Sequence, residues 1–259
     1  MTLRHITLIF LNISILGYLW GMLTLGLNIS PGLPLTPLLT VSSFVFAVLH
    51  AGQREGWRKA AFFVVIVFIT GLAFESFGVA TGLVYGSYHY SDKLGPKFLG
   101  LVPYLIPLAW TFMVYPSMII ADRIIPTAWK GLKKGLVVAA ISGVIMTAWD
   151  VAMDPIMVIG RNWVWEVKGA YFGIPLQNFA GWWLTTFSAV GLYYMITKKI
   201  DEKPLGIPDR WAVYSYTITA TTTIVMALIT GLGGPALAGF FAIFPWVLMG
   251  FLRTDQESV

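Results

Sequence analysis

Eight apolar runs, each long enough to cross a lipid bilayer, constrain this chain more than any other feature of its sequence. A membrane-spanning helix needs about 20 consecutive, mainly apolar residues. Because a segment in lipid must satisfy its own backbone hydrogen bonds, each run predicts a helix. We therefore expect an all-α fold: a single polytopic membrane helix bundle over residues 1–259, with about eight transmembrane helices, seven being the alternative count. The runs begin near Ile6, Pro37, Ala60, Val102, Gly135, Phe179, Trp211 and Gly234.

The residue composition agrees with a membrane location. Hydrophobic residues make up 57% of the chain and charged residues 11%, which is far from the composition of a soluble domain. The first run continues to about Leu27 with no cleavage signature, so it predicts a retained helix rather than a signal peptide. The chain has no cysteine, which excludes disulfides, thiolate catalysis and iron–sulfur or cysteine-based zinc sites.

Positive charges predict the orientation of the bundle. Of the 17 Lys and Arg residues, all but Lys93, Lys97, Arg161 and Lys168 fall on one side when the loops are assigned alternately. By the positive-inside rule, both termini and the loops near residues 55, 130 and 203 are cytoplasmic. We expect a multi-pass protein of the cell membrane. The net charge of +5 follows from this topology and predicts no nucleic-acid partner.

Two long connections on the non-cytoplasmic side, residues 81–101 and 160–177, are rich in Gly, Tyr and Trp rather than in charge. Segments of this composition are expected to fold back over the mouth of a bundle. Glycines at helical spacing flank Glu75 and would let a neighbouring helix or a ligand approach that face. These glycines are Gly71, Gly78 and Gly82.

Three carboxylates lie inside otherwise apolar runs: Glu75, Asp150 and Asp154. An ionisable group at that depth is costly and by default marks a functional site. Their distances from the starts of the runs place all three in the non-cytoplasmic half, and Asp150 and Asp154 share one helical face. Two carboxylates so close in a low dielectric repel, so we expect one to hold its proton unless a cation lies between them. The cluster predicts a buried Brønsted acid.

Structural roles compete with catalytic ones for some of these acids. Asp154 precedes Pro155, where the helix is expected to end, and could bind local backbone or Arg161. Asp122 abuts Arg123 at the cytoplasmic end of the fourth run, and we interpret it as half of an interfacial ion pair.

Aromatic residues are dense on the side that carries the acids. Most are typical of the interfacial belt or of packing, but rings around a pocket could stabilise a carbocation through their faces. Asn178, where the sixth helix is expected to start, is either a helix cap or a contact to water or substrate. The candidate substrate-binding residues are Tyr85, Tyr88, Trp110, Trp149, Tyr171, Asn178 and Trp182.

The three histidines, His5, His50 and His89, are too dispersed for a histidine-rich di-iron centre. His89 lies on the acid-bearing side and is the one histidine kept as a candidate. We predict no metal site.

Five segments between about residues 60 and 195 carry a family signature. They are residues 74–88, around Phe74-Glu75 and Tyr85-Gly86; residues 94–96, Leu-Gly-Pro; residues 148–155, Ala-Trp-Asp-Val-Ala-Met-Asp-Pro; residues 163–165, Trp-Val-Trp; and residues 169–182, around Gly169-Ala-Tyr171 and Asn178. In this order they resemble the carotenoid 1,2-hydratases. That family includes bisanhydrobacterioruberin hydratases of archaea and γ-carotene 1′-hydroxylases of cyanobacteria.

The resemblance implies addition of water, without a cofactor, across the terminal C1=C2 bond of an acyclic carotenoid such as lycopene, γ-carotene or a bisanhydrobacterioruberin-like compound. Such chemistry needs a poorly solvated acid to protonate C2, and π faces and one positioned water around the cation at C1. We assign the proton donor to Asp150 or Asp154, with the other acid holding it in geometry or accepting the proton from water. Glu75 would orient the water or share the proton. Membrane lipid and carotenoid-pathway enzymes are the other expected partners.

Three other activities fit parts of the pattern. An end-group cyclase would use the same protonation but exclude water from the cation. The motif Asp150-Val-Ala-Met-Asp154 could hold Mg²⁺ on a diphosphate, as in an intramembrane prenyltransferase, but a second aspartate-rich motif and basic ligands are missing. A proton-coupled transporter would also use membrane carboxylates, but here they cluster in one half, with no charged residue marking a path through the other.

Overall fold

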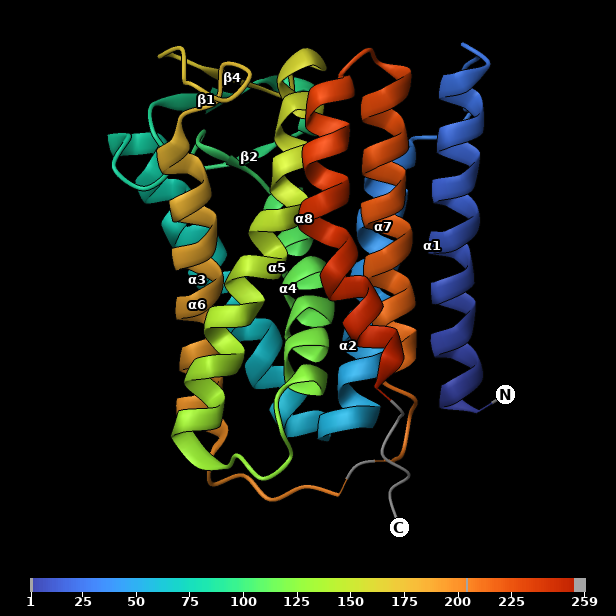
Figure 1. The fold of residues 1–259 in the computed structure, drawn as a ribbon, viewed down its shortest axis with the longest axis vertical. Coiled ribbons are helices and arrows are strands. Elements are labelled where there is room, and N and C mark those ends of the chain that lie inside the picture. The colour runs from blue at the N-terminus through green and yellow to red at the C-terminus, as the bar shows by residue number, and fades with distance from the viewer. Residues whose placement is uncertain (1, 204, 254–259) are drawn as a thin grey trace.

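Among the described residues, eight long α-helices lie side by side in one bundle (Figure 1). The computed structural model describes residues 2–203 and 205–253. Within these residues, seven helices are long and apolar enough to cross a membrane, and α6 is not among the seven. The expected all-α membrane bundle is confirmed. The helices are α1 (Leu3–Gly26), α2 (Leu35–Glu55), α3 (Trp57–Thr81), α4 (Leu105–Ile124), α5 (Gly131–Ile159), α6 (Leu176–Thr197), α7 (Arg210–Ile229) and α8 (Gly233–Leu252).

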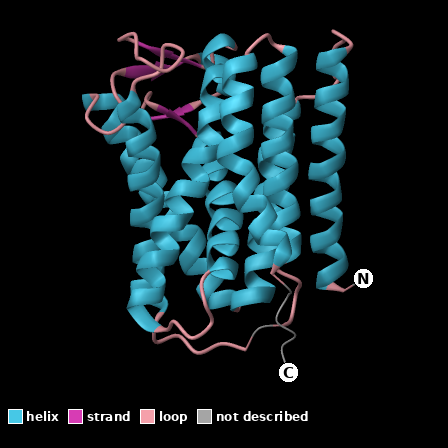
Figure 2. Ribbon diagram, viewed as in Figure 1, coloured by secondary structure: helices cyan, strands magenta, loops and turns pink. Residues whose placement is uncertain are grey.

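The connection between α3 and α4 and the connection between α5 and α6 form a cap of short strands at one end of the bundle (magenta in Figure 2). Strand β1 (Tyr88–Tyr90) pairs antiparallel with β4 (Trp163–Trp165), so that Tyr88 lies opposite Trp165 and Tyr90 opposite Trp163. A second pair joins β2 (Lys97–Phe98) to β3 (Val102–Pro103). Helix α1 begins and α8 ends at the other end of the bundle (Figure 1). The two connections thus fold over the bundle side by side.

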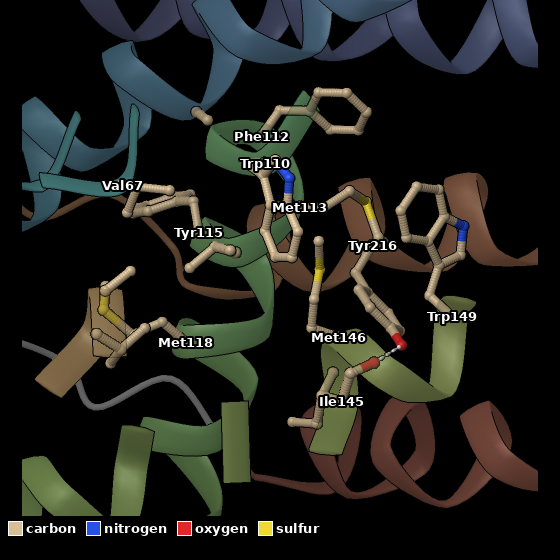
Figure 3. Close-up of a cluster of buried hydrophobic side chains, with 14 of the residues drawn as sticks. Val67, Trp110, Phe112, Met113, Tyr115, Met118, Ile145, Met146, Trp149 and Tyr216 are labelled. Atoms are coloured by element: carbon tan, nitrogen blue, oxygen red, sulfur yellow. Dashed lines mark hydrogen bonds between the residues drawn. The ribbon is translucent and has the colours of Figure 1, made fainter. Parts of the chain in front are cut away.

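Helix α4 lies at the centre of the bundle and contacts α2, α3, α5, α7 and α8. Because it is enclosed on nearly every side, its residues are buried all round the helix rather than along one stripe. Figure 3 shows part of this core, where Met113 of α4 lies near Met146 of α5 and Tyr216 of α7. The Tyr216 hydroxyl donates a hydrogen bond to the Ile145 carbonyl at 2.8 Å, so even the polar atom of this ring is satisfied.

Two glycines make room for one tyrosine between α3 and α6. A Cβ atom on Gly78 would lie 2.6 Å from Tyr85 Cδ2, and a Cβ atom on Gly181 would lie 2.5 Å from Tyr85 Cδ1. The ring of Tyr85 is accordingly buried between the two helices. On the same face of α3, Gly71 makes room for the Trp110 ring. The space beside these glycines is therefore filled by side chains of the protein itself.

Helix α5 does not end at Pro155 but continues to Ile159. A proline inside a helix has no N–H for the carbonyl four residues earlier, which here belongs to Val151. The Tyr171 hydroxyl, from the cap, donates to that carbonyl at 2.9 Å. The predicted helix end is wrong because a distant side chain replaces the hydrogen bond that the proline cannot make.

Ion pairs gather at the end opposite the cap. Arg54 of α2 lies 2.8 Å from Asp122 of α4 and 2.6 Å from Asp209, just before α7. Lys134 of α5 lies 2.7 Å from Asp122. The expected interfacial ion pair of Asp122 is thus part of a network that joins four helices. Fully buried His50 lies nearby and bonds to the Tyr115 hydroxyl at 2.7 Å, so polar groups do occur in this half of the bundle.

Replacing Gly181 by alanine should destabilise the protein by about 1–3 kcal/mol, because the added methyl group overpacks against Tyr85 and the Val84 carbonyl. Thermal unfolding of the purified protein in detergent micelles would measure the change. Gly191→Ala is the matched control, because Gly191 lies on the same helix with nothing within 4 Å of the added atom. An equal loss of stability in both variants would contradict this account of the contact between α3 and α6.

Candidate active site

Three side chains hold the carboxyl group of Glu75, which is buried in the half of α3 nearer the cap. The Tyr90 hydroxyl donates to Glu75 Oε2 at 2.9 Å, and the Tyr88 hydroxyl donates to the same oxygen. The Trp110 indole donates to Glu75 Oε1 at 2.9 Å. The indole can come this close because Gly71, one turn before Glu75, has no side chain. With donors on both oxygens, the carboxyl group is held in one orientation.

The two tyrosines are reliable donors. Burial raises the pKa of the Tyr88 and Tyr90 phenols. Both phenols therefore stay protonated across the neutral range, and each has a hydrogen to donate to Glu75.

Asp150 and Asp154 form a pair of carboxyl groups, one turn apart on α5. The Asn178 side-chain amide donates to Oδ2 of both acids, at 2.8 Å to Asp150 and 2.7 Å to Asp154. The Trp163 indole donates to Asp154 Oδ1 at 2.7 Å. Asp150 Oδ1 is buried with no hydrogen-bond partner in the described part of the chain. Asn178 thus bridges the two acids and does not cap α6, whose N-cap is Pro175.

A single two-stranded sheet supplies donors to both acidic groups. Tyr88 and Tyr90 on β1 bind Glu75, while Trp163 on β4 binds Asp154. The rings also pack in pairs across the sheet, with centroids 5.7 Å apart for Tyr90 and Trp163 and 5.0 Å for Tyr88 and Trp165. The position of the cap therefore affects the carboxyl groups of Glu75 and Asp154 at once, while Asp150 receives its hydrogen bond from Asn178 of α6.

A cavity of about 420 Å³ lies next to Glu75, between α1, α2, α4, α5 and α7. Its volume is in the range of small-molecule sites, and its walls are mostly apolar. Four indole rings line it, those of Trp110, Trp149, Trp163 and Trp182. Trp110 and Trp182 pack with centroids 4.5 Å apart, and Trp182 and Trp149 meet edge to face at 5.9 Å. A buried carboxyl group and several aromatic rings thus share one apolar space.

The structure divides the predicted site residues into two groups. Four of them line the cavity: Glu75, Trp110, Trp149 and Trp182. Among the described residues that line the cavity, Asp150, Asp154, Asn178, Tyr85, Tyr88 and Tyr171 do not occur.

The second group has structural partners. Tyr85 shares a 2.8 Å hydrogen bond with Thr185, and Tyr171 binds the Val151 carbonyl. Tyr88 holds Glu75 from the side of the cap. The remaining candidate, His89, is exposed and pairs with Glu166.

Sequence reasoning missed two features of the site. Tyr90 and Trp163 both line the cavity and bind the acids, and the signal was the alternation in Tyr88-His-Tyr90 and Trp163-Val-Trp165, which is typical of paired strands. The second feature is a threonine-rich stretch, residues 217–223 of α7, which faces the cavity in part. A run of hydroxyl groups in an apolar helix was the available signal.

Comparisons with known proteins agree with these observations. The family model described as "Carotenoid biosynthesis protein" matches residues 35–245. Over 136 residues the chain is 29% identical to a bisanhydrobacterioruberin hydratase of Haloarcula japonica, a stretch that covers 52% of this chain and 45% of that protein. The match spans about half the length of this relative. No solved structure matches the chain.

Replacing Asn178 by leucine should lower the free energy of unfolding by about 1–3 kcal/mol, because it leaves buried carboxyl oxygens without their shared donor. Thermal unfolding in micelles would measure the loss. The neighbouring change Gln177→Leu is the control, because Gln177 is exposed and a bond at the surface contributes less. If the two variants lost equal stability, the bridge between the aspartates would not be the reason.

Proposed function

Because the chain belongs to the carotenoid biosynthesis protein family, we propose that it is a carotenoid 1,2-hydratase of the cell membrane. It adds water across the terminal C1=C2 double bond of an acyclic carotenoid end group. The observation that carries the proposal is the buried carboxyl group of Glu75, which faces an apolar cavity together with the indole rings of Trp110, Trp149 and Trp182. The partial match to a hydratase supports the same type of reaction.

The proposed reaction needs few groups. A carboxyl group protonates C2, the positive charge develops at the tertiary carbon C1, and water attacks C1. The water then returns a proton to the carboxylate, so the acid is regenerated. The ring faces of Trp110, Trp149 and Trp182 would stabilise the cation, because the face of an aromatic ring is negative. An apolar cavity keeps the acid poorly solvated and excludes other nucleophiles.

Glu75 is the acid that we assign to the proton exchange with the substrate, because it is the predicted carboxyl group that lines the cavity. Asp150 and Asp154, the first candidates from the sequence, would act from behind the cavity wall. With Asn178 and Trp163 they join α5, α6 and β4. In this role they keep the cap in the position that orients Glu75.

The prenyltransferase alternative is disfavoured by the bridge between the aspartates. The Asn178 amide donates hydrogen bonds to Oδ2 of both Asp150 and Asp154. Hydrogen atoms therefore point at the two oxygens that would share a Mg²⁺ ion. A Mg²⁺ ion between these two oxygens would need oxygen ligands where the amide hydrogens now lie.

Expression in a lycopene-producing bacterium, followed by chromatography and mass spectrometry of the pigments, tests the function. We expect a more polar pigment, heavier by one water. Glu75→Gln should lower its formation by roughly 10²–10⁴-fold, the usual effect of losing a general acid. Asp150→Asn keeps the amide bridge possible and should reduce product less, mainly through stability.

Other outcomes have definite meanings. A new pigment of unchanged mass would indicate an end-group cyclase. Unchanged pigment, despite verified protein in the membrane, would count against lycopene as the substrate and call for γ-carotene or a bisanhydrobacterioruberin-like carotenoid. Full activity in Glu75→Gln with none in Asp150→Asn would show that the aspartate pair, and not Glu75, donates the proton.

A further inference from the structure

One buried hydroxyl group on α7 breaks the pattern of its neighbours. Thr217, Thr219 and Thr223 each donate to the backbone carbonyl four residues earlier, at 2.7–3.0 Å. This is the usual way in which a threonine in an apolar helix satisfies its hydroxyl. Thr222 is 3% exposed, and its Oγ1 atom has no hydrogen-bond partner in the described part of the chain. A buried hydroxyl without a partner costs about 1–3 kcal/mol, so it calls for an explanation.

Thr222 lines the same cavity as Glu75. The adjacent Thr223 accepts a hydrogen bond from the Trp149 indole at 2.9 Å. Trp149 packs against Trp182, and Trp182 packs against Trp110, whose indole binds Glu75. One continuous aromatic wall thus runs from α7 to Glu75. The Thr222 hydroxyl is a polar group of this cavity that is free to bind what occupies it.

We propose that Thr222 binds the water that attacks C1. The inference rests on the proposed function. Thr222 Oγ1 would accept a hydrogen bond from the water, which leaves a water lone pair free for the bond to C1. The C1=C2 electron pair forms the new C2–H bond with the proton from Glu75, the water oxygen bonds to C1, and the water gives a proton back to Glu75. The alcohol therefore contains all the atoms of the substrate and the water, and no other reactant is needed.

The position of the water decides the fate of the cation. If water is held at C1, the cation becomes alcohol. If it is not, the cation returns a proton from C2 or from a methyl group and becomes alkene again. In deuterium oxide the first route gives the alcohol, while the second leaves deuterium in the recovered carotenoid. The ratio of hydration to deuterium exchange therefore reports on the water and not on the acid.

The experiment uses membranes that contain the full chain, supplied with lycopene in buffered deuterium oxide, with mass spectrometry of alcohol and recovered lycopene. Thr222→Val keeps the shape of the side chain and removes the hydroxyl. We expect roughly 5–10-fold less alcohol, as for the loss of one hydrogen bond, with deuterium exchange unchanged or higher. Because the hydroxyl has no partner among the described residues, the melting temperature should stay equal or rise. Thr222→Ser, which restores the hydroxyl, should recover hydration.

Thr186→Val is the matched control. Thr186 is also fully buried with an unpartnered hydroxyl, but it lies on α6 and is not among the described residues that line the cavity. Its removal should leave both hydration and exchange as in the unmodified protein.

Three results would overturn the inference. If Thr222→Val hydrates as well as the unmodified protein, Thr222 does not bind the attacking water, although the proposed function stands. If hydration and exchange fall together, and Thr222→Ala behaves alike, the residue has a structural role only. If the unmodified protein neither hydrates nor exchanges any of the three candidate carotenoids, the proposed function itself fails, and the role of Thr222 fails with it.

Discussion

Three carboxyl groups buried at membrane depth need hydrogen-bond donors, and the architecture around the cap follows from that need. Lipid offers no donors, so an acid in an apolar bundle must receive them from the protein. The sheet of β1 and β4 supplies them on one side, from Tyr88 and Tyr90 to Glu75 and from Trp163 to Asp154. Asn178 and Trp110 supply them from α6 and α4. The cap thus supplies part of the buried surroundings of the acids and does more than cover the end of the bundle.

Aromatic residues of the cap and of the cavity wall donate their polar hydrogens to protein oxygens. Phenol and indole groups of the cap turn their polar hydrogens toward carboxyl oxygens. Trp110 and Trp149 direct their N–H groups to Glu75 and Thr223, and both rings line the cavity. Because the polar atom of each indole is already bonded, what remains for a ligand is the apolar body and its π face. A space of this kind suits a hydrocarbon that becomes positively charged during a reaction.

Features that depend on local sequence could be predicted, whereas contacts between residues far apart in the chain could not. The buried acids, the helices that carry them and the indoles Trp110, Trp149 and Trp182 could be chosen from residue type and position in an apolar run. Two local inferences went wrong or fell short, at Pro155 and at Asn178, and both involve partners far away in the chain. Tyr171 donates to the carbonyl of Val151, 20 residues away in the chain, and so replaces the hydrogen bond that Pro155 cannot make. Asn178 joins two acids that lie 24 and 28 residues away. No local pattern contains that information.

By itself the sequence determined that this is a bundle of membrane helices with acids near one end, since apolar length and buried charge act on each segment independently of the others. Only the tertiary structure decided which acid faces the cavity, because that depends on how α1, α2, α4, α5 and α7 pack around a common space. It also decided which hydroxyl on α7 lacks a partner. Thr219, Thr222 and Thr223 are the same residue type on one helix, but their surroundings differ. A hydrogen bond depends on the atoms that packing brings within reach.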